Sequence, residues 1–218
     1  MKSCTVILLL VLGMCAAGFA HPLLPYVGAA VQLSGTQEET VTLPQNDVHQ
    51  SPSLFPGMGF QIEGGEALNF CNAYVGFRVD GGGKRDHSVM SAVNYRFTAE
   101  RFLVGARLHI SDEYANPVKP LIGGAITYGW AQRIHELAGG DWQAGVMSED
   151  HSAGAFGWLG EIGCYVKTRS PMYLSFLLRF ESLNSQFGDQ SKEGSVANVY
   201  QLGIQAGVIY QLNRGLSL

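Results

Sequence analysis

The sequence predicts an all-β protein whose fold is an eight-stranded antiparallel up-and-down transmembrane β-barrel. Three observations support this fold class. Apolar and polar residues alternate with a period of two along eight segments, several of which run for ten residues or more. The chain has 28 glycines and starts with an export signal. No later apolar run reaches the length of a membrane-spanning helix, and the sequence shows neither heptads nor a sustained helical period.

Residues 1–20 have the features of a cleavable signal peptide. Lys2 gives a positive start, residues 5–14 form an apolar run too short to span a membrane, and Gly18-Phe19-Ala20 supplies small residues at the cleavage positions. We expect cleavage after Ala20, which leaves residues 21–218 as one barrel domain. That domain has 13 Lys and Arg against 18 Asp and Glu, a net charge of −5, so nothing favours nucleic acid as a partner.

The strands are justified by the alternation, which is clearest near the end of the chain. In YQLGIQAGVIYQL, every second residue from Tyr200 to Leu212 is apolar, and glutamine or glycine fills most positions between them. Tilted strands of about 9–11 residues are what a bilayer requires. The predicted strands, in order, are 24–35, 68–80, 88–98, 101–111, 119–134, 153–168, 171–184 and 198–212.

The connections between these strands alternate in length. Long polar connections are expected at 36–67, 135–152 and 185–197, and short ones at 81–87, 111–118 and 169–171. Outer-membrane barrels place short turns in the periplasm and long loops outside the cell. Thr98-Ala99-Glu100 is expected to form a tight hairpin on the long-loop side. Residues 55–65 fit either an extension of the second strand or a hairpin inside the first loop.

The two faces of the predicted strands differ in composition. One face is apolar and has no Lys, Arg, Asp or Glu, whereas the other holds the charged residues together with many glycines and alanines. Small residues suit the crowded interior of a narrow barrel, but they would weaken a strand surface that faces water. We therefore expect the apolar face to contact lipid. The alternatives are a soluble eight-stranded calyx or a sandwich with that face inside.

Aromatic residues of the apolar face gather near the long-loop end, which predicts an interfacial girdle. Its expected members are Tyr95, Phe97, Phe102, Tyr128, Trp130, Phe156, Trp158, Phe180 and Tyr200. The inward charges predict a lumen network that acts as a plug or a gate. Its expected members are Arg78, Arg96, Arg107, His109, Arg133, Glu161, Arg179 and Glu181. The excess of arginine predicts a preference for anions if water passes through.

The sequence gives weaker grounds for catalysis or metal binding. His109, Ser111 and Glu113 resemble the His-x-Ser pair and nearby acid of lipid A 3-O-deacylases. Their expected position inside the bore, at the periplasmic end, is far from a substrate in the outer leaflet. No catalytic residue is therefore expected.

Metal binding and a disulfide are likewise not expected. His135, Glu149, Asp150 and His151 share one predicted loop but lack the rigid spacing of a metal site, so we expect neither a metal nor a cofactor. Cys71 and Cys164 fall on the apolar face of strands that are not neighbours, which predicts two free thiols.

Two stretches are similar to the strand openings of small outer-membrane barrels. They are LPYVGAAVQL at 24–33 and KPLIGGAITYG at 119–129, and they resemble the OmpW-like and OmpA-like superfamily of eight-stranded barrels. The resemblance implies a bacterial outer membrane, contact with its lipid, and insertion by the barrel-assembly machinery. Such barrels commonly end on an aromatic residue. This chain continues past Tyr210 to Leu218, so its assembly signal is either displaced to Tyr210 or different.

The leading functional hypothesis is a narrow porin-like channel or passive carrier for small hydrophobic or anionic solutes, the role that the resemblance to OmpW-like barrels implies. The alternative is a non-conducting surface scaffold or adhesin whose long loops bind host or matrix molecules. A lipid A-modifying hydrolase is a third and more remote reading.

Overall fold

The computed structural model describes residues 24–42, 47–50, 55–67, 70–88, 91–110, 116–138, 146–168, 171–187 and 195–212. The predicted signal peptide and its cleavage site lie outside these residues. The described chain consists almost entirely of strands. Their bounds are β1 Leu24–Thr42, β2 Asp47–Gln50, β3 Phe55–Ala67, β4 Cys71–Ser88, β5 Ser91–His109, β6 Val118–Ala138, β7 Val146–Lys167, β8 Met172–Phe187 and β9 Ser195–Gln211. No helix within the described ranges is long and apolar enough to cross a membrane.

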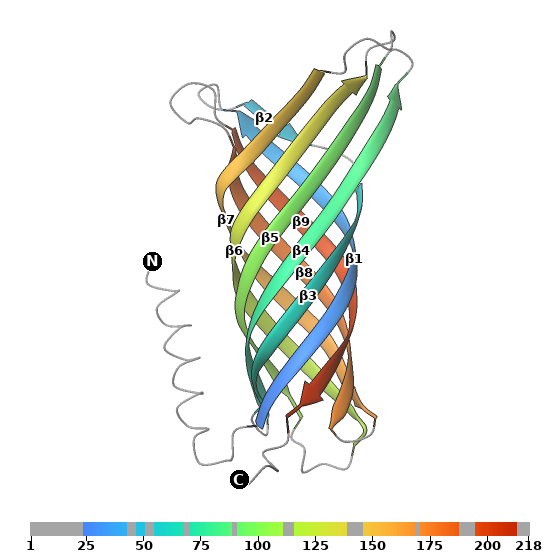
Figure 1. Ribbon diagram of the computed structural model, residues 1–218, viewed down its shortest axis with the longest axis vertical. Coiled ribbons are helices and arrows are strands. Elements are labelled where there is room, and N and C mark those ends of the chain that lie inside the picture. The colour runs from blue at the N-terminus through green and yellow to red at the C-terminus, as the bar shows by residue number, and fades with distance from the viewer. Residues whose placement is uncertain are drawn as a thin grey trace.

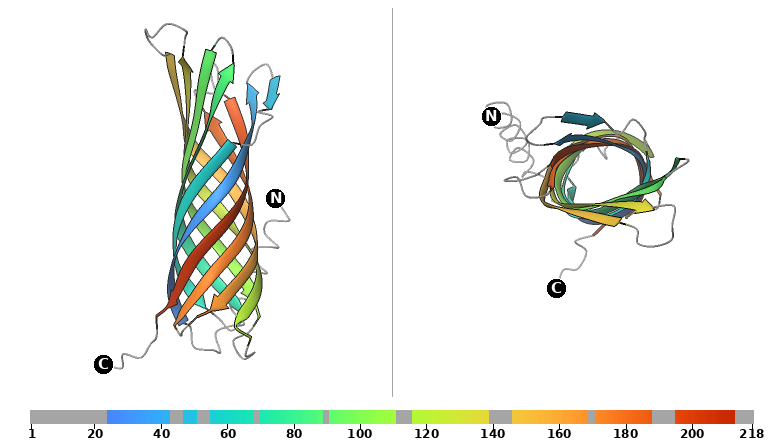
Figure 2. Two further views of the ribbon diagram at one scale, coloured as in Figure 1. Left: turned by 90° about the vertical axis from the view of Figure 1, so that its right-hand side faces the viewer. Right: turned by 90° about the horizontal axis from the view of Figure 1, so that it is seen from above.

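Eight of the strands close into a barrel, which Figure 1 shows from the side and Figure 2 from above. Sequential wall strands pair antiparallel, and β1 pairs with β9 from Tyr26↔Gln211 to Thr42↔Ser195. This last pairing leaves the wall without an open edge, as a membrane-spanning sheet requires. The short strand β2 pairs only with the far end of β1. The predicted fold class is confirmed.

The wall strand β3 corrects the predicted loop at 36–67. Residues 55–67 pair with β1 on one side and with β4 on the other, so they form a full strand of the barrel. The alternation is present here, with Met58, Phe60 and Ile62 outside and Gln61 and Glu63 inside. The alternation is hard to recognise in the sequence, because the segment also contains four glycines and Pro56, which are typical of turns.

The single strand β5 corrects the predicted hairpin at Thr98-Ala99-Glu100. Pairing with β4 and β6 continues through these residues without interruption, so 88–98 and 101–111 are not two strands. Likewise, residues 81–87 were expected to be a short turn but belong to β4. One strand was missed and one was counted twice, which is why the predicted total of eight still holds.

The two ends of the barrel differ. The turns β3–β4, β5–β6 and β7–β8 lie at one end together with the start of β1 and the end of β9. We call this the short-turn end; it is the lower end in Figure 1. We call the opposite end, where β4 to β7 reach highest in Figure 1, the long-loop end.

The wall turns its apolar residues outward and its charged residues inward. Leu33, Val104 and Ile204 are 64%, 64% and 66% exposed on the outside, whereas Arg107 and Arg179 are each 1% exposed inside. A soluble calyx or sandwich would show the opposite arrangement. Those two alternatives are therefore wrong.

Candidate functional site

Aromatic side chains surround part of the outer wall at one level. Phe102, Tyr128 and Phe156 are cross-strand partners on β5, β6 and β7. The ring centroids of Phe102 and Trp130 are 6.2 Å apart, and those of Trp158 and Phe180 are 5.4 Å apart. The exposed members of the predicted girdle are Phe102, Tyr128, Trp130, Phe156, Trp158 and Phe180. Tyr200 is half-buried on β9.

Because β5 runs without a turn through residues 98–100, two predicted site residues lie on the face opposite to the one that was predicted. Phe97 was expected in the girdle but lies inside the barrel, where it is 1% exposed. Arg96 was expected in the lumen but is exposed on the outer face. The predicted hairpin at 98–100 had assigned the residues before it to the wrong faces of the strand, because a one-residue shift exchanges inward and outward positions. Tyr95 and Arg133 lie on β5 and β6, and their side chains are outside the described residues.

The outer face between the girdle and the short-turn end is apolar. Val118 and Trp130, both exposed on β6, bound a stretch that rises by about 30 Å at the strand tilt typical of such barrels. This height matches the hydrocarbon core of a bilayer, roughly 30 Å. Phe70 and Tyr210 are exposed at the lower limit of the same band. The exterior therefore has the dimensions of a membrane-spanning surface.

Inside the barrel, four charged residues form the lower ion-pair layer, which we define as Glu63, Arg107, Glu161 and Arg179. Arg107 Nε lies 2.6 Å from Glu161 Oε1, and Arg179 Nη2 lies 2.8 Å from Glu161 Oε2. Arg107 also contacts both carboxylate oxygens of Glu63, with Nη2 2.8 Å from Oε2. One carboxylate thus bridges two arginines, and four wall strands are joined across the bore.

Neutral polar groups complete this layer. Gln61 accepts a hydrogen bond from Arg179 Nη1 at 2.7 Å and donates one to Glu63 at 2.6 Å. Tyr74 donates to Glu161 at 3.3 Å, and the guanidinium of Arg107 lies 4.1 Å from the centroid of the Tyr74 ring. Buried ionic groups need this degree of saturation, because each unpaired charge is costly in a medium with little water.

A second set of charges, the upper ion-pair layer, lies nearer the long-loop end and consists of Arg78, Asp80, Arg101 and Glu181. Arg78 lies 2.7 Å from Asp80 and 3.1 Å from Glu181. Arg101 Nη1 lies 2.5 Å from Glu181 Oε1, and Arg101 Nη2 contacts the carboxylate oxygen Oδ2 of Asp80. Arg78 also donates to Gln201 at 3.2 Å, which ties the layer to β9.

The charges of the two layers balance. Four arginines face four carboxylates, all of them inside the barrel and nearly inaccessible. The predicted excess of arginine is therefore absent from these two layers, and the preference for anions, which was inferred from it, stays an untested prediction. Sequence reasoning missed Glu63, Asp80 and Arg101. Part of the signal for Arg101 was available, since Thr-Ala-Glu contains no turn-forming residue; the apolar alternation, however, changes phase between Phe97 and Phe102.

Above the upper ion-pair layer, small and apolar side chains close the bore. We call this cluster the apolar cap; its members are Phe97, Ala99, Ala131, Ala155, Leu183 and Val199. Each is at most 4% exposed. Water that moved along the axis would have to cross both ion-pair layers and this cap.

Glycines on the inner face make room for the charged side chains. A Cβ added at Gly59 would collide with the Asp80 carboxylate, and one at Gly203 would collide with the Gln32 amide. These glycines are therefore required by close approach in a narrow bore.

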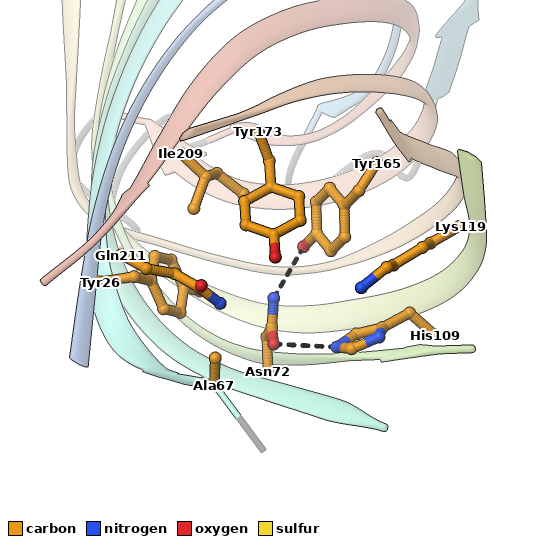
Figure 3. A pocket seen from close by; sticks show the side chains of 9 residues that line it. All are labelled: Tyr26, Ala67, Asn72, His109, Lys119, Tyr165, Tyr173, Ile209 and Gln211. Carbon is orange, nitrogen blue, oxygen red and sulfur yellow. Dashed lines mark hydrogen bonds between the residues drawn. The ribbon is translucent and has the colours of Figure 1, made fainter. Parts of the chain in front are cut away.

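A small cavity lies at the short-turn end, below the lower ion-pair layer, and Figure 3 shows its lining. Its volume is about 20 Å³, room for one or two water molecules. His109, a predicted lumen residue, lines it and hydrogen-bonds through Nε2 to Asn72 Oδ1 at 3.0 Å. Another cavity, of about 10 Å³, adjoins Arg107 and Glu63.

The remaining candidate residues receive no support as a reactive site. Ser111 and Glu113 lie outside the described residues, so the suggested set with His109 has no geometry to report. His135, Glu149, Asp150 and His151 are on β6 and β7, not in a loop, and their side chains are not described. Cys71 and Cys164 do not form a disulfide; they belong to β4 and β7, which β5 and β6 separate.

Comparisons with known proteins place this geometry among outer-membrane barrels. No protein-family model matches the sequence, and no curated protein matches it. Among solved structures, the attachment invasion locus protein Ail of Yersinia pestis matches with a TM-score of 0.51 and 10% identity over 83% of this chain and 97% of that chain. Neisserial surface protein A follows with 0.49 and 16% identity over 84% and 97%. OprG of Pseudomonas aeruginosa gives 0.49 and 7% over 88% and 98%.

At these identities the likeness is one of fold. Together with the apolar exterior, the girdle and the polar lumen, it defines the class of the protein: a small eight-stranded β-barrel of the outer-membrane type. The fold supports the predicted location in a bacterial outer membrane. The more specific likeness to OmpW-like barrels stays a prediction.

Proposed function

We propose that the protein is a non-conducting outer-membrane scaffold that holds a raised β-sheet wall above the membrane for contact with molecules outside the cell. The observation that carries this proposal is the filled lumen. Two charge-balanced ion-pair layers and the apolar cap lie one above another along the bore. An apolar constriction of this kind excludes water, and paired charges give an entering ion no site to occupy.

The strand lengths support the second half of the proposal. β6 continues from Trp130 in the girdle to Ala138, a rise of about 20 Å at the usual tilt. β7 begins at Val146, well before girdle residue Phe156. Arg96 and Glu100 are exposed on the outside of β5 above Phe102, where an apolar surface gives way to a charged one. A membrane anchor alone would not need strands that extend this far beyond the bilayer.

The narrow channel that the sequence first suggested has less support. It rests on the resemblance to OmpW-like barrels. Its preference for anions depended on an excess of arginine, and Glu63 and Asp80 supply the missing negative charge in the two layers. Breaking the layers would also leave buried charges unpaired, which costs about 3–5 kcal/mol for each broken pair. The barrel-assembly machinery remains the expected partner for insertion, and host or matrix molecules the expected partners of the raised wall.

Conductance measurements test the proposal. The refolded barrel is reconstituted into planar bilayers, with a general porin as positive control, and compared with the variants Glu161→Gln and Arg179→Gln. We expect no resolved current steps from any of the three, because the apolar cap stays in place. Reproducible steps in the wild type, with ion selectivity altered by Glu161→Gln, would overturn the scaffold and support the channel.

Surface display needs a separate test. An epitope inserted between Ser88 and Ser91, at the top of β4 and β5, should be accessible to antibody on intact cells. The matched control is an epitope between Ala67 and Cys71 at the short-turn end, which should become accessible only after lysis. Adhesion of intact cells to a panel of immobilised matrix proteins and polysaccharides then measures contact. An unchanged adhesion profile with and without the barrel would refute that role.

A further inference from the structure

His109 lies at the end of β5, at the short-turn end, and both of its ring nitrogens face oxygen atoms. Nδ1 lies 2.9 Å from the backbone carbonyl oxygen of Ile110, and Nε2 lies 3.0 Å from Asn72 Oδ1. Carbonyl and amide oxygens only accept hydrogen bonds, so both contacts are satisfied when both nitrogens carry hydrogen, as in the imidazolium ion. A neutral imidazole has a single N–H and would turn a lone pair toward one of the two oxygens.

The two acceptors differ in their freedom to move. The Ile110 carbonyl belongs to the backbone directly after β5, where the N–H of His109 is held by the Phe70 carbonyl at 2.8 Å. Asn72 instead presents a side-chain amide, which can turn by half a rotation and exchange an oxygen for an NH₂ group of nearly the same shape. After that turn, Asn72 Nδ2 donates to an unprotonated Nε2. Neutral His109 therefore keeps its hydrogen on Nδ1, and Asn72 is the group that turns.

The turn of Asn72 also changes the hydrogen bond to Tyr165. Asn72 Nδ2 donates to the Tyr165 hydroxyl at 3.3 Å, and the same hydroxyl accepts from Arg107 Nη1 at 3.3 Å. Figure 3 shows the row that runs from His109 through Asn72 to Tyr165. Once Asn72 presents its oxygen, Tyr165 becomes the donor and accepts from Arg107 alone. Because Arg107 belongs to the lower ion-pair layer, the protonation of His109 is linked to that layer.

The groups that surround His109 leave it as the residue that titrates. The rings of His109 and Tyr165 lie 5.8 Å apart, and Lys119 of β6 is close enough to act on the imidazole electrostatically. Tyr26 of β1 and Tyr173 of β8 line the same cavity, whose described lining contains no aspartate or glutamate. Lysine and tyrosine normally keep their protonation states between about pH 5 and 8, whereas histidine changes its charge in this range.

We propose that His109, Asn72 and Tyr165 form a proton-driven relay that links the pH of the periplasm to the lower ion-pair layer. The short-turn end lies in the periplasm in barrels of this layout. In acid, the imidazolium donates to Ile110 and Asn72, and Asn72 donates to Tyr165. When Nε2 loses its proton to water, Asn72 turns and Tyr165 donates to it. Each state has the same number of hydrogen bonds in this row, so the proton on His109 decides between them.

NMR of the isotope-labelled full barrel in micelles, titrated between about pH 5 and 8, tests the relay. The ¹⁵N shifts of the His109 ring report its charge and the position of its hydrogen. The side-chain amide of Asn72 reports the turn, and the ¹³Cζ shift of Tyr165 reports whether its hydroxyl donates or accepts. We expect all three signals to change with one midpoint, and the neutral imidazole to carry its hydrogen on Nδ1.

Variants separate the relay from the electric field of the imidazolium. In Asn72→Ala, His109 should still titrate, but the Tyr165 step should be lost. In Tyr165→Phe, which leaves the rest of the row intact, the Asn72 amide should still respond at the His109 midpoint. His109→Gln should abolish both responses, and the control His87→Gln, near the opposite end of β4, should alter neither.

Three results would overturn the relay. They are a His109 ring that does not change its charge in this range, a neutral ring with its hydrogen on Nε2, and a Tyr165 step of undiminished size in Asn72→Ala. Should Asn72→Ala not fold, an Asn72 amide that ignores the His109 midpoint in Tyr165→Phe would overturn it equally. None of these results depends on whether the lumen conducts or the wall binds matrix.

Discussion

Arg107 on β5 and Glu63 on β3 form a two-pronged ion pair across the lumen, with Nη2 2.8 Å from Oε2 and Nη1 in contact with Oε1. The two strands are not neighbours, because β4 lies between them. The pair therefore holds together strands that share no backbone hydrogen bonds, and it fixes the position of β3, which sequence analysis did not recognise as a strand.

Glu63→Gln should destabilise the barrel by about 3 kcal/mol, at the low end of the cost of breaking a buried ion pair, because Arg107 keeps Glu161 as a partner. The free energy of unfolding in urea, followed by tryptophan fluorescence in micelles, measures this effect. Glu66→Gln is the control, since Glu66 is exposed on the same strand and should change stability by less than about 0.5 kcal/mol. Equal effects of the two substitutions would contradict the lumen assignment of Glu63.

Gly59→Ala should destabilise the barrel by about 1–3 kcal/mol, because its Cβ would displace the Asp80 carboxylate from Arg78 and Arg101. Gly64→Ala on the same strand is the control. A Cβ at Gly64 meets only the Tyr26 carbonyl at 3.7 Å, an ordinary contact. The same urea titration distinguishes the two, and an unchanged Gly59→Ala would show that the upper ion-pair layer can shift without loss.

Val104→Arg should cost about 2–4 kcal/mol, because it places a charge on the lipid-facing side near the middle of the apolar band. Glu100→Arg, two outward positions toward the start of β5 and opposite girdle residue Trp130, should cost only about 0–1 kcal/mol, as expected near the membrane interface. Refolding equilibria in phosphatidylcholine vesicles measure both. Were the two substitutions equally harmful, the level assigned to the membrane surface would have to move.

Cys71 and Cys164, the two cysteines that follow the predicted cleavage site, should both react with a maleimide after unfolding without reductant, giving two adducts by intact mass of the mature chain. The structure places them on β4 and β7, with two strands between them, too far apart for a disulfide. In the folded barrel, Cys71 should react more slowly, because it is only 5% exposed whereas Cys164 is half-buried. A mass two daltons lower with no adducts would refute the strand order.

The sequence predicts the barrel because apolar and polar residues alternate regularly along most of the wall strands. Segments such as Tyr200 to Leu212 leave no doubt about phase, and six of the girdle residues are exposed as expected. The failures have one physical origin. A one-residue error in phase moves every side chain to the other face, so the hairpin assumed at Thr98-Ala99-Glu100 exchanged Phe97 and Arg96 and concealed Arg101.

The lumen was harder to predict than the wall. Glu63 precedes two glycines in a segment that resembles a loop, and Asp80 ends the predicted strand 68–80, directly before three glycines that were expected to form a turn. Glycines elsewhere on the inner face make room for these carboxylates, Gly28 beside Glu63 and Gly59 beside Asp80. Which arginine meets which carboxylate depends on strand tilt and on the curvature of the closed wall. Neither can be obtained from the order of residues along one strand.

The pairing of β1 with β9 has a consequence for biogenesis. Until the last segment of the polypeptide arrives, β1 and the newest strand would each expose a row of unmet amide and carbonyl groups to hydrocarbon. The arginines of β4 and β5 would also lack the Glu161 and Glu181 carboxylates, which belong to the later strands β7 and β8. An unclosed sheet is therefore strongly unfavourable in the bilayer. We expect insertion to be a single, late event that is completed when β1 pairs with β9.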